Sequence, residues 1–154
     1  QSPSCNPYCT AFEAIINRKA VQPVIKAMQK LHPEYIDNQL KNLGYDKKEL
    51  SITMMIGEFR RLLQDYHFYI KDNFSNQFTT DPILNVYDFD FFKKFTVIHK
   101  IRRKCMHWED IGEGKKHSLD VKDLDSLRTE MLGIGGISCI EYMLRLADVC
   151  ETLS

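Results

Sequence analysis

His107, Glu109 and Asp110 place one imidazole and two carboxylates within a run of four residues. If that run is helical, His107 and Asp110 can touch, because residues three or four apart share a face. Acid–base catalysis also requires a nucleophile or a metal ion beside such a pair, and the neighbouring sequence supplies neither. We therefore interpret the pair as a contact that orients the end of a helix.

The motifs for metal and phosphate chemistry are missing as well. The remaining histidines are scattered singly, at positions 32, 67, 99 and 117. Cys105 and His107 are two positions apart, and one such pair does not make a zinc site. The run Gly133-Ile134-Gly135-Gly136 lacks the Lys-Ser/Thr pair and the preceding strand of a phosphate loop, so we interpret it as a turn between helices. We predict that the protein is not an enzyme and uses no metal or cofactor.

Basic residues gather between positions 93 and 104. The candidate binding surface that they form consists of Lys93, Lys94, Arg102, Arg103 and Lys104. Apolar residues recur between these basic residues at spacings of three and four. This helical period favours a simpler interpretation, in which the basic residues form the solvent face of an amphipathic helix. The whole chain carries 21 basic and 21 acidic residues, and this zero net charge argues against nucleic acid as a partner.

The region from Tyr66 to Phe92 is rich in aromatic side chains. Its members are Tyr66, His67, Phe68, Tyr69, Phe74, Phe78, Tyr87, Phe89, Phe91 and Phe92. A helix that carries aromatic residues on both faces is either buried on both or presents one of them to a partner. Two interpretations therefore remain open, a hydrophobic core and a protein-binding surface, since aromatic residues dominate the hot spots of interfaces.

Three features of the sequence favour an oxidising compartment. Five cysteines are present, at positions 5, 9, 105, 139 and 150, and they gather toward the two ends. The sequence begins at Gln1 rather than Met, which suits a chain whose signal peptide has been removed. Asn73-Phe74-Ser75 is a candidate N-glycosylation site. We predict a secreted protein.

Two related motifs lie near the two ends of the chain. Cys5-Asn6-Pro7-Tyr8-Cys9 has the pattern C-x-x-Y-C, and Cys139-Ile140-Glu141-Tyr142-Met143 repeats it with methionine at the fifth position. On a helix the first and fifth positions share a face, so two such motifs are placed to join the terminal helices. The structural motif residues are Cys5, Tyr8, Cys9, Cys139 and Tyr142.

This arrangement resembles the bicycle proteins, secreted effectors of aphid salivary glands that are named for two C-x-x-Y-C motifs. The resemblance covers the motif positions and the helical, secreted character rather than a long stretch of sequence. It implies delivery into plant tissue, where some members are linked to gall development, and action inside or outside host cells. It also implies a host protein as partner and no catalytic residues.

The cysteine positions limit the disulfides that the chain can form. Cys139 and Cys150 share one face of a predicted helix but lie about 16 Å apart along it. A disulfide requires Cα atoms within about 7 Å, so these two cannot bond to each other. We expect Cys5 and Cys9 to bond partners among Cys105, Cys139 and Cys150. Cys105 is the candidate free thiol, because it lies on an apolar stripe.

The apolar residues recur at helical spacing throughout the chain, and no window alternates as a strand does. The predicted helices cover a stripe up to position 19 and then 23–31, 33–43, 46–70, 81–87, 88–108, 120–132 and 137–153. No run of about 18 apolar residues marks a membrane span. We predict one all-α domain over 1–154, a compact bundle of five to seven helices with disulfides tying the N-terminal segment to the C-terminal half.

Taken together, these patterns favour a secreted, non-enzymatic effector that binds host macromolecules. Two alternatives stay open, a helical cytokine-like ligand and a small-ligand carrier with aromatic and methionine residues around a cavity. The molecular target, the host pathway and the oligomeric state do not follow from the sequence.

Overall fold

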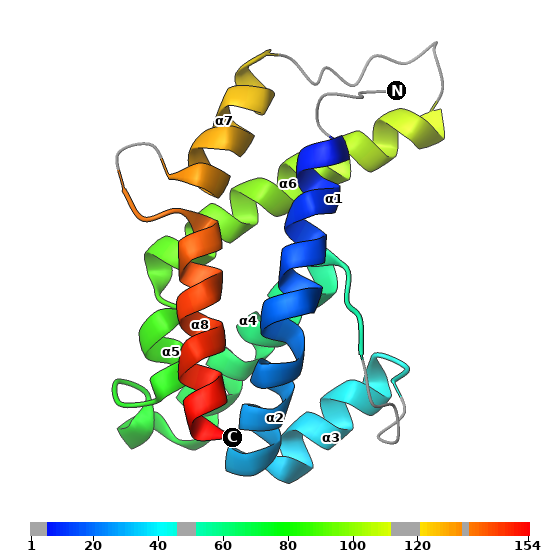
Figure 1. Ribbon diagram of the computed structural model, residues 1–154. Coiled ribbons are helices and arrows are strands. Elements are labelled where there is room, and N and C mark those ends of the chain that lie inside the picture. The colour runs from blue at the N-terminus through cyan, green and yellow to red at the C-terminus, as the bar shows by residue number, and fades with distance from the viewer. Residues whose placement is uncertain (1–5, 46–51, 112–120, 134–135) are drawn as a thin grey trace.

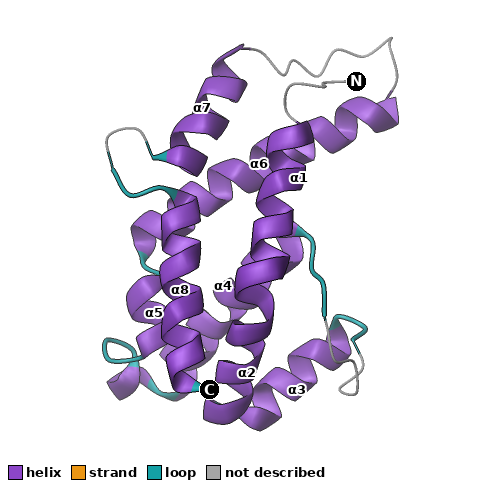
Figure 2. Cartoon of the chain, in the orientation of Figure 1, coloured by secondary structure: helices purple, strands orange, loops and turns teal. Residues whose placement is uncertain are grey.

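The computed structural model describes residues 6–45, 52–111, 121–133 and 136–154 of the 154-residue chain. Within these ranges the regular structure is entirely helical, as Figure 2 shows, so the predicted all-α fold is confirmed. None of the helices in these ranges combines the length and the apolar character needed to cross a bilayer.

The first helical segments form one continuous rod, which Figure 1 shows in blue. It consists of α1 (Asn6–Ile15), a π-helical turn η1 (Ile16–Ala20) and α2 (Val21–Leu31). The sequence pattern predicted a break before Pro23, but the chain only widens into the π turn there. Proline cannot donate the usual helical hydrogen bond, and the wider turn accommodates that loss without ending the helix.

The other helices pack around this rod. They are α3 (Pro33–Asn42), α4 (Ile56–Asn73), the 3-10 turn η2 (Ser75–Gln77), α5 (Pro82–Val86), α6 (Phe89–Ile111), α7 (Val121–Leu132) and α8 (Cys139–Leu153). With the rod counted as one, the described residues form seven α-helices, within the predicted range. Figure 1 shows α8 running beside the rod in the same direction, and α8 contacts both α2 and η1.

Four phenylalanines form the centre of the core. Phe95 of α6 lies edge-on to Phe12 of the rod at 6.0 Å between ring centroids, and it lies 6.4 Å from Phe59 of α4. Phe91 stacks on Phe95 at 6.1 Å. All four side chains are fully buried, so this contact joins the rod to α4 and α6.

The helix that we predicted from Asp46 begins later than expected. Positions 46–51 lie outside the described residues, residues 52–55 are not helical, and α4 starts at Ile56. The amide of Asn17 bonds both main-chain groups of Met54, which holds that residue out of a helix. Glu58 then accepts a hydrogen bond from the Met55 N–H at 3.0 Å and caps the new helix start.

The predicted disulfides are not found. The described residues contain no disulfide, and both Cys139 and Cys150 are buried free thiols. The charged groups near the three described thiols differ: Glu130 and Lys94 act on Cys139, Asp81 acts on Cys150, and Arg102 and Glu13 act on Cys9. Burial raises the pKa of Cys150 to about 12 and that of Cys9 to about 11. Cys5 and the Cys105 side chain, the candidate free thiol, lie outside the described residues.

Candidate functional site

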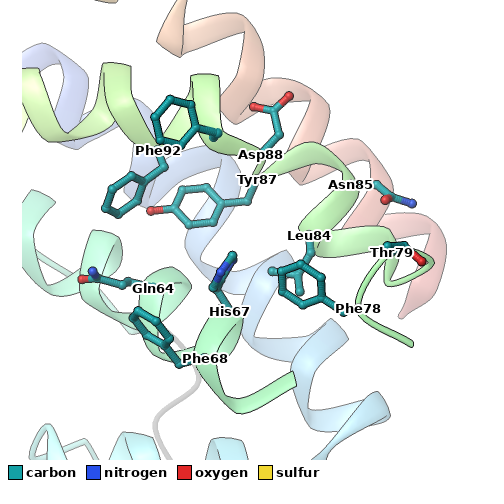
Figure 3. A pocket seen from close by; sticks show the side chains of 11 residues that line it. Gln64, His67, Phe68, Phe78, Thr79, Leu84, Asn85, Tyr87, Asp88 and Phe92 are labelled. Atoms are coloured by element: carbon teal, nitrogen blue, oxygen red, sulfur yellow. The ribbon is translucent and has the colours of Figure 1, made fainter. Parts of the chain in front are cut away.

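A cavity of about 540 Å³ opens at the surface between α4, α5 and the start of α6. We call it the aromatic groove, and its lining, drawn in Figure 3, consists of Gln64, His67, Phe68, Phe78, Thr79, Leu84, Asn85, Tyr87, Asp88, Phe89 and Phe92. Six of these eleven residues carry aromatic rings if the imidazole is included, so the walls are mainly apolar with a few polar groups at intervals.

Buried Asp81 fixes the wall that α5 provides. As the N-cap of α5, one of its carboxylate oxygens accepts hydrogen bonds from the Ile83 and Leu84 N–H groups at 2.9 and 3.0 Å. Its other oxygen accepts a 2.7 Å bond from the hydroxyl of Tyr66, a fully buried residue of α4. Because a buried carboxylate is tolerated only when it is hydrogen-bonded, this three-bond set keeps α5 at one position against α4.

Tyr87, at the corner between α5 and α6, lies across the middle of the groove (Figure 3). Its ring lies edge-on to Phe91 at 5.0 Å and to Phe92 at 6.1 Å. Only 3% of the residue is exposed, and its hydroxyl has no hydrogen-bond partner in the described part of the chain. Burial raises the pKa of this hydroxyl above its usual range, so it stays protonated and neutral.

His67 provides the imidazole of the groove. Its ring lies edge-on to Phe78 at 4.9 Å and to Phe68 at 5.4 Å. Burial, and then the charge of Lys71, lower the pKa of His67, so the ring is neutral at pH 7. At neutral pH it therefore acts as part of the apolar wall.

Arg60 supports the groove from the side of α4. Its guanidinium lies 4.9 Å from the centroid of the Phe92 ring, and its Nε donates to the Thr96 hydroxyl at 3.1 Å. A cation over an aromatic face contributes about 0.5–1 kcal/mol at an exposed site. These two contacts hold Phe92 and the first turns of α6 against α4.

The rim of the groove exposes two large apolar side chains. Phe89 of α6 is 79% exposed, and Phe68 of α4 is 50% exposed. Asp88 is the one charged side chain in the lining, and its Oδ1 accepts a 2.9 Å bond from the Phe91 N–H as the N-cap of α6. The groove therefore combines an apolar interior, an exposed aromatic rim and one carboxylate.

In the structure, some side chains of the aromatic region lie in the core and others line the groove. Tyr66 and Phe91 are fully buried in the core. Tyr69 and Phe74 pack with His32 and Tyr35 in a second aromatic cluster, where Tyr35 and Tyr69 stack at 3.9 Å. The other six members of the region line the groove: His67, Phe68, Phe78, Tyr87, Phe89 and Phe92.

Sequence reasoning missed the polar members of the lining, which are Gln64, Thr79, Asn85 and Asp88. Gln64 precedes His67 and Phe68 by three and four positions, so it shares their helix face, and that spacing was the available signal. The positions of Thr79 and Asn85 depend on how α5 folds back against α4. No local pattern in the sequence encodes that arrangement.

Three of the five residues of the predicted basic surface form ion pairs in the structure. Lys94 pairs with Asp90 at 3.2 Å and with Glu130 at 3.9 Å. Arg102 pairs with Glu13 of α1 at 3.2 Å, and Lys104 pairs with Asp123 of α7 at 3.0 Å. These two pairs join α6 to the two neighbouring helices. Lys93 and Arg103 are exposed. This arrangement favours the interpretation as a solvated, ion-paired helix face.

The motif tyrosines join helices outside the groove. Arg128 of α7 donates to the Tyr8 hydroxyl at 3.2 Å and lies over its ring at 5.5 Å. The Tyr142 hydroxyl donates to Asp90 at 2.6 Å, and the ring stacks on Phe91 at 5.0 Å. That hydrogen bond, and then Lys94, lower the pKa of Asp90. Each tyrosine therefore connects its own helix to a neighbour, α1 to α7 and α8 to α6.

Two predicted positions remain. Asn73, the candidate glycosylation site, is exposed at the last position of α4, where its amide donates to the Tyr69 carbonyl at 3.0 Å. The side chains of the acid–base run at 107–110 lie outside the described residues. The described side chains hold no group of three or more histidine, cysteine, aspartate or glutamate residues placed to bind a metal ion.

Comparison of the chain with family models, with curated proteins and with solved structures gives no match.

Proposed function

We propose that this protein is a secreted, non-enzymatic effector that enters plant tissue and acts by binding a host protein through the aromatic groove. The resemblance of the end motifs to the aphid bicycle family supports the place of action. The geometry of the groove supports the mode of action.

The observation that carries the proposal is the exposure of Phe89 and Phe68 at the rim. Full burial of a large apolar side chain contributes about 1.5–3 kcal/mol relative to full exposure, and these two rings forfeit that energy in proportion to their exposed area. A partner protein that covers both rings recovers this energy and fills the cavity between them. Aromatic side chains beside a pocket are typical of interface hot spots.

A small-ligand carrier is the second candidate, and the volume of the groove favours it. About 540 Å³ falls within the range of ordinary ligand pockets, which are also mainly apolar with a few polar groups. A ligand held inside the cavity leaves the outer face of Phe89 in water, however. We therefore prefer a macromolecular partner.

Affinity capture from host tissue tests the proposal. We expect proteins captured by the wild-type chain to bind at least about tenfold more weakly to the double variant Phe68→Ala/Phe89→Ala, since each aromatic hot spot contributes more than about 1 kcal/mol. Leu132→Ala is the matched control, because Leu132 is 60% exposed on α7 and outside the groove. Equal capture by the double variant and the wild type contradicts the proposal.

A further inference from the structure

The walls of the groove limit the form of any protein segment that enters it. The walls belong to α4, α5, α6 and the turn before α5, and the described residues contain no strand. An extended segment would therefore find no sheet edge to pair with its own N–H and C=O groups. A helix satisfies these groups internally and needs only side-chain contacts from the groove. The geometry favours a helical segment with one apolar face.

The charge of the lining limits what lies beside that apolar face. Asp88 is the one charged residue among the eleven that line the groove. It is exposed, and its hydrogen bond to the Phe91 N–H fixes it at the start of α6. A fixed carboxylate next to an apolar surface favours a cationic group on the partner and disfavours an anionic one.

We infer that the groove receives an amphipathic helix of the partner, which presents bulky apolar side chains to the aromatic lining and a lysine or arginine to Asp88. This inference rests on the proposed function and specifies the chemistry of the partner. Phe68 and Phe89 flank the apolar face of the incoming helix, while Asp88 sets its charge preference.

Two model peptides with the same helical leucine spacing test the inference, one with lysine and one with glutamate at the polar positions. Fluorescence anisotropy with the full chain at physiological salt measures both affinities. We expect the leucine–lysine peptide to bind about three- to tenfold more tightly than the leucine–glutamate peptide, as befits one partly exposed charge pair. Asp88→Asn keeps an oxygen that caps α6, removes the charge, and is expected to reduce the preference below about twofold.

Matched controls separate the groove from general charge attraction. Asp72→Asn removes the same charge from an exposed position of α4 outside the lining and is expected to leave the preference unchanged. A leucine–lysine peptide of equal composition with a central proline cannot form the helix and is expected to bind more weakly. The Phe68→Ala/Phe89→Ala variant is expected to weaken binding of the intact peptide.

Four results would each overturn the inference: equal binding of the two intact peptides, a preference that survives Asp88→Asn, binding that is unchanged in the rim variant, or binding that is unchanged by the central proline. Each outcome differs from a failure of the proposed function. If host-protein capture depends on Phe68 and Phe89 while the two intact peptides bind equally, the charge preference is wrong and the proposed function stands; if the proline peptide binds as tightly as the intact one, the helical form is wrong and the proposed function again stands.

Discussion

At the scale of single residues, Asn17 makes the contact that decides where α4 begins. Its amide accepts from the Met54 N–H at 2.7 Å and donates to the Met54 carbonyl and to the Glu13 carbonyl, both at 2.9 Å. The residue belongs to the π turn η1, and 37 positions separate it from Met54. One amide thus joins the rod to the segment that leads into α4.

Replacing Asn17 is expected to weaken the fold more than an exposed amide replacement. Asn17→Ala leaves the main-chain groups of Met54 without their partner, and each lost hydrogen bond costs about 1 kcal/mol or more. We expect the free energy of unfolding in urea to fall by about 1–3 kcal/mol. Asn38→Ala, at an exposed position of α3, is the control and is expected to change it by less than about 0.5 kcal/mol. Equal effects of the two variants would contradict this assignment.

At the scale of elements, the contact between α4 and α6 depends on a glycine. A Cβ added at Gly57 would lie 2.6 Å from Cε1 and 3.2 Å from Nδ1 of His99, closer than side chains tolerate. His99 projects from α6 against the first turn of α4, and its Nδ1 is buried with no hydrogen-bond partner in the described residues. The absence of a side chain at position 57 lets the imidazole pack there.

We expect Gly57→Ala to lower the free energy of unfolding, although alanine favours a helix by about 1 kcal/mol over glycine. Overpacking costs about 1–3 kcal/mol and outweighs that gain. His99→Ala removes the obstacle, so adding Gly57→Ala to it is expected to be neutral or stabilising. This double-mutant cycle isolates the contact. Gly136→Ala, where a Cβ meets nothing within 4 Å, is the control. Equal effects of Gly57→Ala with and without His99 would disprove the contact.

Local patterns predicted the elements well wherever local interactions decide their ends. Asp81-Pro82 opens α5, Asp88 caps α6 and Ser138 caps α8, and aspartate and serine are common cap residues before an apolar stripe. Gly44 follows α3 with φ +87°, a conformation that glycine adopts without strain. These signals lie within a few residues of the helix ends, so the sequence displays them.

The errors arose where distant segments decide the local structure. The apolar spacing of Met54 and Met55 is helical, but the bonds from Asn17 prevail over it. The sequence shows that the region from Tyr66 to Phe92 is rich in aromatic residues. Which of them lie in the core and which line the groove depends on the packing of α5 against α4 through Asp81 and Tyr66. The disulfide prediction relied on spacing along the chain, and the fold places the thiols beside different charged neighbours.

At the scale of the whole molecule, three histidines make stability depend on pH. Burial is the main cause that lowers the pKa of His32, His67 and His99 in the folded protein. Positive neighbours add to this, Lys71 at His67 and the arginines 60, 103 and 102 at His99, while Asp81 partly opposes it at His32. All three rings are therefore harder to protonate in the folded protein than in the unfolded chain.

The sign of the effect follows from where the protons bind. Below about pH 6.5, the ordinary pKa of histidine, the unfolded chain takes up protons that the folded protein still refuses. Stability is therefore present in full above about pH 6.5 and is lost as the pH falls toward the lowered folded-state pKa values. The carboxyl group of Asp90 does not oppose this trend. Its ordinary pKa already lies below the pH range in which the histidines titrate, and its pKa in the folded protein is lower still.

We expect the urea midpoint to be lower at pH 5.5 than at pH 7.5, with the native helical signal as readout. Replacing His67 and His99 by glutamine removes two of the three rings whose protonation the fold resists, so the midpoint of that variant is expected to change less between the two pH values. Lys71→Gln leaves His67 in place but removes its positive neighbour, and it is expected to weaken the pH dependence by a smaller amount.

A urea midpoint that is unchanged or higher at pH 5.5 would show that these imidazoles become protonated in the folded protein as readily as in the unfolded chain. The same measurement bears on the proposed function, because a protonated His67 would place a positive charge beside Phe68 and Phe78, where the proposed partner helix would pack.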